Sequence, residues 1–196
     1  MAAVSDWVRR FAPLVGEGEV LDLACGGGRH ARHFAERGHQ VLALDRNADS
    51  LAELTAGAGT GSIATVQFDL EDGVSPWPFA AGRFAGIVVT NYLHRPLFSH
   101  LASSLAADGV LIYETFAIGN EAFGKPSNPD FLLQEGELLA LAAQYKLRVI
   151  AFEDGVSAFP KPAMVQRLVA TGPAFSRSRA LLALPQGREK RDSGQE

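Results

Sequence analysis

Cysteine is almost absent from the 196 residues of this sequence, since Cys25 stands alone. A lone cysteine excludes an internal disulfide and cannot build a cysteine-based zinc site, which fits a reducing compartment such as the cytoplasm. The five histidines repeat no carboxylate–histidine spacing, so we predict no metal site. No apolar run approaches the roughly 20 residues of a membrane span, and the N-terminal segment is too polar for a signal peptide. We therefore predict a cytoplasmic protein without a membrane segment.

Positive charge is also scarce, because 18 lysines and arginines face 22 aspartates and glutamates. The formal net charge of −4 lacks the basic field that non-specific binding to a phosphate backbone requires. Nucleic acid is therefore a disfavoured partner, and a small molecule is the favoured one. With 47% hydrophobic residues, the chain can cover one core but hardly two. We expect one domain, whose state as monomer or homodimer the sequence leaves open.

What the sequence does contain is a regular alternation of apolar runs and segments of helical periodicity. It predicts strands at residues 19–24, 40–45, 62–70, 84–91, 109–116, 147–154 and 164–171, and helices at residues 4–14, 29–38, 47–57, 96–106 and 136–145. Such alternation indicates an α/β fold, a mostly parallel seven-stranded sheet with helices on both faces. The last two strands have no helix between them, so they should form an antiparallel hairpin. The alternation stops at residue 172, which predicts one domain over 1–171 and a flexible tail over 172–196.

A glycine cluster, Gly26-Gly27-Gly28, connects the first predicted strand to the first helix of the alternation. Backbone amides and the positive helix end then face the carboxyl edge of the sheet, where open α/β sheets bind ligands. Asp45 ends the second predicted strand and Asp69 ends the third. Because parallel strands end at one edge, the two carboxylates and the glycine loop should line one site. For the glycines alone, a tight turn without a ligand is the alternative.

This pattern of D-L-A-C-G-G-G followed by two acidic strand ends resembles the class I S-adenosylmethionine (SAM)-dependent methyltransferases over about residues 19–171. The resemblance implies a Rossmann-like sheet of strand order 3-2-1-4-5-7-6 with strand 7 antiparallel, and SAM as the cofactor. It places around the methionine end Asp22, Ala24, Gly26 and Gly28, at the ribose Asp45, and at the adenine Asp69 with Leu70. Ala24 departs from the family, which often has its first glycine there.

Four neighbours join the predicted cofactor-binding set: Cys25, Arg29, Arg46 and Asn91. Arg29 either reaches the carboxylate of SAM or is an exposed helix residue, and for Cys25 a small packing residue of the cofactor loop is favoured over a nucleophile. A nicotinamide-dependent oxidoreductase is the rival interpretation, since residues 26–31 also satisfy G-x-G-x-x-A. A non-catalytic SAM-binding module is the third. The acidic residue before the glycines and the acidic end of the third strand favour the methyltransferase.

The segment that follows the fourth predicted strand holds the candidate catalytic residues Tyr92, His94 and Arg95. His94 is a candidate general base or a helix cap, Arg95 a partner for an anionic group or a solvated charge, and Tyr92 a wall of the pocket. The segment lacks the N-P-P-Y motif of methyltransferases that act on adenine or glutamine amino groups.

A loop at residues 116–131 follows the fifth predicted strand, and its length predicts a lid over the acceptor, with a surface loop anchored by Phe123 and Phe131 as the alternative. Together with the YLHRP segment, this loop resembles small bacterial methyltransferases of the tellurite-resistance type. The methyl acceptor stays open among a small molecule, a protein side chain and a tRNA, ranked in that order.

Overall fold

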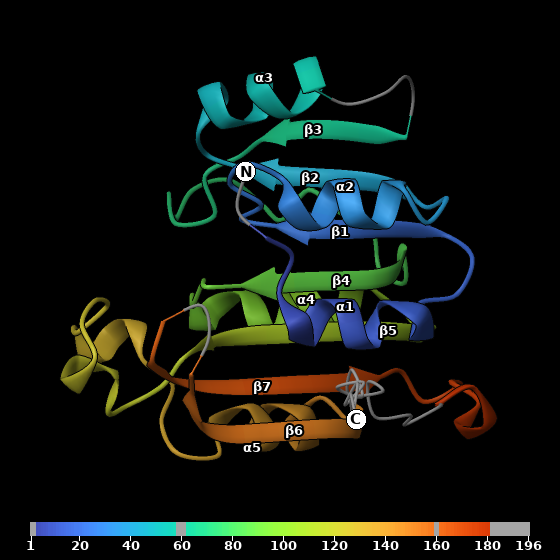
Figure 1. The fold of residues 1–196 in the computed structure, drawn as a ribbon. Helices are drawn as coiled ribbons and strands as arrows, with labels where there is room; N and C mark the ends of the chain where they lie inside the picture. The colour runs from blue at the N-terminus through green and yellow to red at the C-terminus, as the bar shows by residue number, and fades with distance from the viewer. Residues whose placement is uncertain (1–2, 58–61, 159–160, 181–196) are drawn as a thin grey trace, which may run out of the picture.

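The computed structural model describes residues 3–57, 62–158 and 161–180, which contain one seven-stranded sheet of order β3-β2-β1-β4-β5-β7-β6 (Figure 1). Its strands are β1 (Glu19–Leu23), β2 (Gln40–Asp45), β3 (Ile63–Gln67), β4 (Phe84–Thr90), β5 (Leu105–Phe116), β6 (Arg148–Ser157) and β7 (Ala163–Thr171). Strand β7 runs antiparallel to both neighbours, and the remaining pairs are parallel. The predicted fold class and strand order are confirmed.

Helices cover both faces of the sheet, as predicted (Figure 1). The described helices are α1 (Asp6–Phe11), α2 (Arg29–Ala35), α3 (Ala48–Gly57), α4 (Phe98–Ser104) and α5 (Glu137–Gln144). Side chains of α1, α2 and α3 pack in one apolar cluster, and those of α4 and α5 pack in the other. Successive residues of β1 divide between these clusters, Val20 facing the first and Leu21 the second. Both faces of the central strands are therefore buried, which explains the apolar runs of β1, β2 and β4.

The adjacent strands β1 and β4 both end in a sharp backbone turn at the carboxyl edge of the sheet. Ala24 follows β1 with φ 52° and Asn91 follows β4 with φ 55°. Residues other than glycine rarely adopt this left-handed conformation, and such strain concentrates at functional sites. The two turns mark the middle of this edge as the place to look for a ligand site.

The described part of the segment assigned to the tail, residues 172–180, packs on the sheet. Phe175 is 2% exposed within the cluster that α1 and α2 also form. Arg179, in the short 3₁₀ helix η5 (Arg177–Arg179), donates to the Leu14 carbonyl at 3.0 Å. Packed chain thus extends past the predicted boundary at residue 171, and residues 181–196 of the predicted tail lie outside the described residues.

None of the helices in the described ranges has the length and apolarity to cross a membrane. Within those ranges, histidine, cysteine and carboxylate side chains form no group of three or more that could hold a metal ion.

Candidate functional site

Two cavities meet at the carboxyl edge of the sheet and share the turn residues Ala24 and Asn91 as walls. The glycine-loop cavity, of about 670 Å³, lies beside residues 25–27, Arg29 and the N-terminal residues Ala3 and Val4. The strand-edge cavity, of about 530 Å³, lies beside the segments that follow β2, β3, β4 and β5. Its walls include Asp45, Arg46, Phe68, Asp69, Leu70, Glu71, Tyr92, Thr115, Phe116, Pro126 and Phe131. The structure therefore brings most of the predicted cofactor residues together around one continuous edge.

Asp45 fixes the glycine loop from the end of β2. Its Oδ2 accepts the Gly26 N–H at 2.7 Å, and its Oδ1 accepts the Asn47 N–H at 2.9 Å. The Cys25 N–H donates to the Leu44 carbonyl at 3.0 Å, which extends the same attachment. Because each carboxylate oxygen has a second lone pair, Asp45 can still accept hydroxyl groups from a ligand in the strand-edge cavity.

Asp22 supports the loop from beneath and lines neither cavity. It is 1% exposed, and its carboxylate accepts the Ala31 N–H at 2.8 Å, which caps the first turn of α2. Burial raises the pKa of Asp22 to about 7, although the Ala31 hydrogen bond and the nearby Arg29 charge act in the opposite direction. Asp22 therefore orients the helix whose N-terminal end faces the glycine-loop cavity.

His30, which the sequence did not single out, ties the N-terminal segment to the end of β4. Its Nε2 lies 3.3 Å from the Ser5 backbone nitrogen, and its Nδ1 lies 3.3 Å from the Thr90 hydroxyl. Burial lowers the pKa of His30 to about 3, so the ring is neutral at pH 7. Since the Ser5 N–H can only donate, Nε2 is the acceptor and Nδ1 carries the hydrogen toward Thr90. His30 thereby holds the segment that supplies the Ala3 and Val4 wall.

The end of β3 provides the other side of the strand-edge cavity. Phe68 and Leu70 contribute apolar surface there, and the Asp69 carboxylate accepts the Glu71 N–H at 2.9 Å. Trp77 packs in the turn between β3 and β4 and does not line the strand-edge cavity. Its indole stacks on His100 and donates to the Ser104 hydroxyl.

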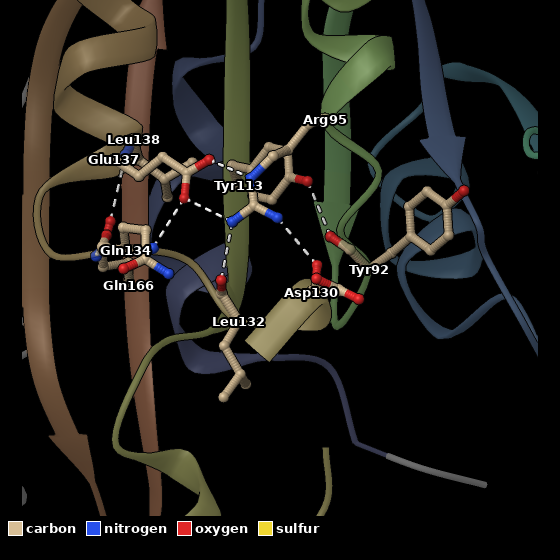
Figure 2. Close-up of polar contacts among 9 residues, drawn as sticks. All are labelled: Tyr92, Arg95, Tyr113, Asp130, Leu132, Gln134, Glu137, Leu138 and Gln166. Atoms are coloured by element: carbon tan, nitrogen blue, oxygen red, sulfur yellow. Dashed lines mark hydrogen bonds and ion pairs between the residues drawn. The ribbon is translucent and has the colours of Figure 1, made fainter. Parts of the chain in front are cut away.

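Tyr92 and Glu71, which both line the strand-edge cavity, are joined by a hydrogen bond. Its hydroxyl donates to the Glu71 Oε1 at 3.0 Å, and its carbonyl accepts the buried Tyr113 hydroxyl at 2.8 Å (Figure 2). Burial, together with the hydrogen bond to Glu71, raises the pKa of Tyr92 far above its ordinary value. Its phenol is therefore protonated at neutral pH and acts as a hydrogen-bond donor. The sequence gives no local signal for Glu71, because its partner Tyr92 lies 21 residues away.

Arg95 points to the loop after β5 instead of the cavities, and it lines neither of them. It makes a two-pronged ion pair with Glu137, at 2.7 Å and 2.9 Å (Figure 2). This hydrogen bonding raises the pKa of Arg95. His94 begins the 3₁₀ helix η2 (Arg95–Leu97) without a capping side-chain bond, and it also lies off both cavity walls.

The loop after β5 reaches the strand-edge cavity through Pro126 and Phe131. Its buried anchor is polar: Asn120 is 1% exposed, donates to the Pro126 carbonyl and accepts the Met164 N–H. The phenylalanines that the sequence offered as anchors, Phe123 and Phe131, are 43% and 49% exposed. Of the two, Phe131 lines the strand-edge cavity, so its half-exposed ring is available to a ligand.

Comparison with known proteins gives one family and several related folds. Residues 20–109 match a family model described as a methyltransferase domain. A 77-residue stretch is 32% identical to the 2-heptyl-1-hydroxyquinolin-4(1H)-one methyltransferase of Mycobacteroides abscessus. That match covers 39% of this chain, and the chain spans about a third (34%) of the length of that relative.

Two solved structures share the fold over most of this chain. TehB from Haemophilus influenzae superposes with a TM-score of 0.71 and 18% identity, covering 88% of this chain and 63% of TehB. The Burkholderia thailandensis 1,6-didemethyltoxoflavin-N1-methyltransferase, solved with 1,6-didemethyltoxoflavin and S-adenosylhomocysteine bound, gives 0.63 and 19%, covering 85% of this chain and 76% of that one. At such identities the superpositions show a common fold.

Proposed function

Because the chain carries a class I SAM-dependent methyltransferase domain, we propose that it transfers the methyl group of SAM to a small heteroaromatic acceptor. One observation carries the proposal above the others. The glycine-loop cavity and the aromatic strand-edge cavity meet at Ala24 and Asn91, so a cofactor along the sheet edge and an acceptor beside it can share one junction.

The residues present fit SAM along this edge. Asp45 keeps free lone pairs for the ribose hydroxyls, and Phe68 with Leu70 offers apolar contact to an adenine. The glycine loop and Arg29 line the adjoining cavity, where backbone amides and a guanidinium suit the methionine carboxylate. Asp22 and Gly28 support this arrangement without lining it, and Cys25 contributes to its wall.

A flat acceptor that carries no negative charge suits the strand-edge cavity, because carboxylates outnumber basic groups on its described walls. Tyr92, Phe116 and Phe131 give it three aromatic walls, and Arg46 is the one basic residue among the described residues that line it. Aromatic walls favour planar rings through offset stacking. The names of two similar proteins agree with this chemistry, because 2-heptyl-1-hydroxyquinolin-4(1H)-one and 1,6-didemethyltoxoflavin are both heteroaromatic.

The chain's own residues have two tasks in the transfer: alignment of the acceptor, and proton removal where the acceptor carries a proton. When bound, SAM supplies an electrophilic methyl group on its sulfonium. The single hydroxyl hydrogen of Tyr92 is donated to Glu71, so its phenol oxygen can accept a hydrogen bond from an O–H or N–H of the methyl acceptor. Glu71 lies on the cavity wall and His94 does not, which favours Glu71 over His94 as the group that accepts the proton.

The test is a methyl-transfer assay with labelled SAM and two named compounds, 2-heptyl-1-hydroxyquinolin-4(1H)-one and 1,6-didemethyltoxoflavin, beside fractionated metabolites, protein and RNA. We expect label in one of the two compounds or in a small aromatic metabolite. Label confined to protein or RNA would contradict the small-molecule acceptor.

Calorimetry with S-adenosylhomocysteine and NADH separates the methyltransferase from the rival interpretations. Binding of NADH without S-adenosylhomocysteine would point to an oxidoreductase. Binding of S-adenosylhomocysteine with no transfer to any fraction would point to a non-catalytic module. We further place the protein in the cytoplasm, on its lone cysteine, and regard nucleic acid as the disfavoured partner on its negative charge.

A further inference from the structure

Arg95 holds the backbone on both sides of one aromatic wall of the strand-edge cavity. Its Nη1 donates to the Asp130 carbonyl and its Nη2 to the Leu132 carbonyl, each at 2.9 Å (Figure 2). The residue between these two carbonyls is Phe131, which lines the cavity. The guanidinium thus binds the C-terminal end of the short 3₁₀ helix η4 (Pro129–Phe131).

Glu137 fixes the guanidinium in this orientation. Its two carboxylate oxygens accept from Arg95 Nε and Nη2, and Oε2 also accepts the Gln134 N–H at 2.8 Å. Burial alone would raise the pKa of Glu137, but the Arg95 and Gln134 hydrogen bonds outweigh it and lower the pKa. Four hydrogen bonds engage four of the five N–H groups of Arg95, so little capacity remains for an anionic ligand.

A separate hydrogen bond holds the wall that follows β4. The Tyr113 hydroxyl donates to the Tyr92 carbonyl, while the Tyr92 ring points away from Arg95 toward the cavity (Figure 2). On the other side, the buried Gln166 of β7 accepts the Leu138 N–H and donates to the Gln134 carbonyl. The segment after β4 is thereby attached to β5, and the segment that leads into α5 is attached to β7.

We propose that Arg95 is a positioning residue that sets acceptor selectivity by holding Phe131 in the wall of the strand-edge cavity. This inference rests on the proposed function, because it concerns the acceptor side of the same site. Arg95 acts through the Asp130 and Leu132 carbonyls and touches neither cavity. Its planar fork reaches both carbonyls at once, which a lysine ammonium on a flexible stem cannot reproduce.

A matched control lies at the opposite edge of the sheet. Arg83 forms a two-pronged ion pair with Glu19 at 2.7 Å and 3.1 Å, with similar side-chain exposure, between the start of β1 and the residue before β4. Arg83→Lys therefore removes a comparable fork without touching the loop after β5. Any change in amide exchange or kinetics that Arg95→Lys shows and Arg83→Lys lacks is therefore caused by the lost contacts with the loop after β5.

The first measurement is amide hydrogen exchange in the protein without acceptor. The Leu132 N–H donates to the Pro129 carbonyl and the Leu133 N–H to the Phe116 carbonyl, so both report on the order of the loop. Loss of two charge-assisted hydrogen bonds should speed their exchange roughly 10- to 100-fold in Arg95→Lys and leave it unchanged in Arg83→Lys. Equal exchange in both variants overturns the proposal, whether or not any methyl transfer is found.

The second measurement is kinetic and uses whichever of 2-heptyl-1-hydroxyquinolin-4(1H)-one and 1,6-didemethyltoxoflavin is methylated. In Arg95→Lys we expect the KM for this acceptor to rise about tenfold, while kcat and the affinity for S-adenosylhomocysteine change by less than about threefold. Because Arg95 acts through Phe131, adding Arg95→Lys to Phe131→Leu should change KM by less than about twofold. Faster amide exchange with an unchanged KM overturns the role of Arg95 in selectivity. If neither compound is methylated, that result contradicts the proposed acceptor and leaves the exchange measurement as the test of Arg95.

Discussion

The carboxylate of Asp45 serves both the protein and its expected ligand, at the scale of a single residue. It already accepts the backbone N–H groups of Gly26 and Asn47, so its removal loosens the glycine loop and also takes away the proposed acceptor for the ribose hydroxyls. We expect Asp45→Ala to weaken S-adenosylhomocysteine binding roughly 10- to 100-fold, the loss of charge-assisted hydrogen bonds. Titration calorimetry checks this, with Asp49→Ala on the exposed side of α3 as the control.

Unchanged affinity in a folded Asp45→Ala protein would remove this residue from the cofactor site. Circular dichroism establishes the folded state before the titration is interpreted.

Asp22 makes stability depend on pH. Its folded pKa of about 7 lies above the ordinary 3.8, so the folded protein retains a proton that the unfolded chain releases between these values. Through this group, the free energy of unfolding falls as pH rises from about 4 to about 7 and is level above that. Asp22→Asn keeps an oxygen for the Ala31 N–H and removes the titrating group. The free energy of unfolding of this variant should therefore rise relative to that of the native protein as pH increases across this window.

Urea unfolding of both proteins at pH 5, 6, 7 and 8 gives the measurement. A difference in unfolding free energy that is the same at all four pH values contradicts a raised pKa at Asp22.

At this scale, the sequence predicts residues whose role follows from position along a strand. The glycine loop, Asp45 and Asp69 all sit at strand ends, and the structure places them on one edge. Partners far apart along the chain carry no such signal. Arg95 meets Glu137 across 42 residues, and for that reason its partner could not be anticipated from its neighbours.

The scale of the element shows why the turn from β1 into α2 requires glycine. Gly28 has φ 69°, and a Cβ there would lie 2.5 Å from a methyl carbon of Leu54 on α3. Gly28→Ala should therefore lower the free energy of unfolding by about 1–3 kcal/mol or more, through strain and overlap together. Gly73→Ala is the control, since Gly73 has φ 66° with nothing within 4 Å of its added Cβ.

Thermal unfolding of both variants separates the cost of the left-handed backbone angle from the cost of the overlap with Leu54. If Gly28→Ala and Gly73→Ala lose equal stability, the packing of α3 on this turn contributes nothing, and the glycine is required for its backbone angle alone.

The elements themselves were largely predictable, because apolar runs of strand length and helical periodicity are local properties. Their ends were less so. Strand β5 begins at Leu105, earlier than the predicted residue 109, because Leu105 pairs with Phe84 of β4 before an irregularity in the ladder. Such pairing depends on a neighbour 21 residues away, which periodicity within one segment does not contain.

At the scale of the whole molecule, the described C-terminal segment packs on the face of the sheet that α1 covers. Phe175 is buried against the α1 side of the sheet, and its carbonyl accepts from Arg148 at 3.0 Å. We expect Phe175→Ala to cost about 3–5 kcal/mol in the free energy of unfolding, as large apolar truncations in a core do. Phe123→Ala, at a half-exposed position, is the control and should cost far less.

Urea denaturation with intrinsic tryptophan fluorescence compares the two variants. A cost for Phe175→Ala no larger than that for Phe123→Ala would mean that the segment after β7 adds nothing to the stability of the domain.

The position of β7 between β5 and β6 has a consequence for synthesis on the ribosome. Strand β6 pairs with β7 alone among the described strands, and β7 also covers the open edge of β5. A nascent chain synthesised as far as residue 157 therefore exposes the unpaired edge of β5, and its β6 has no strand to pair with. At translation speeds of about 5–20 residues per second, β5 waits several seconds for the last strand. During that interval the growing polypeptide is a substrate for chaperones and vulnerable to pairing with other nascent chains.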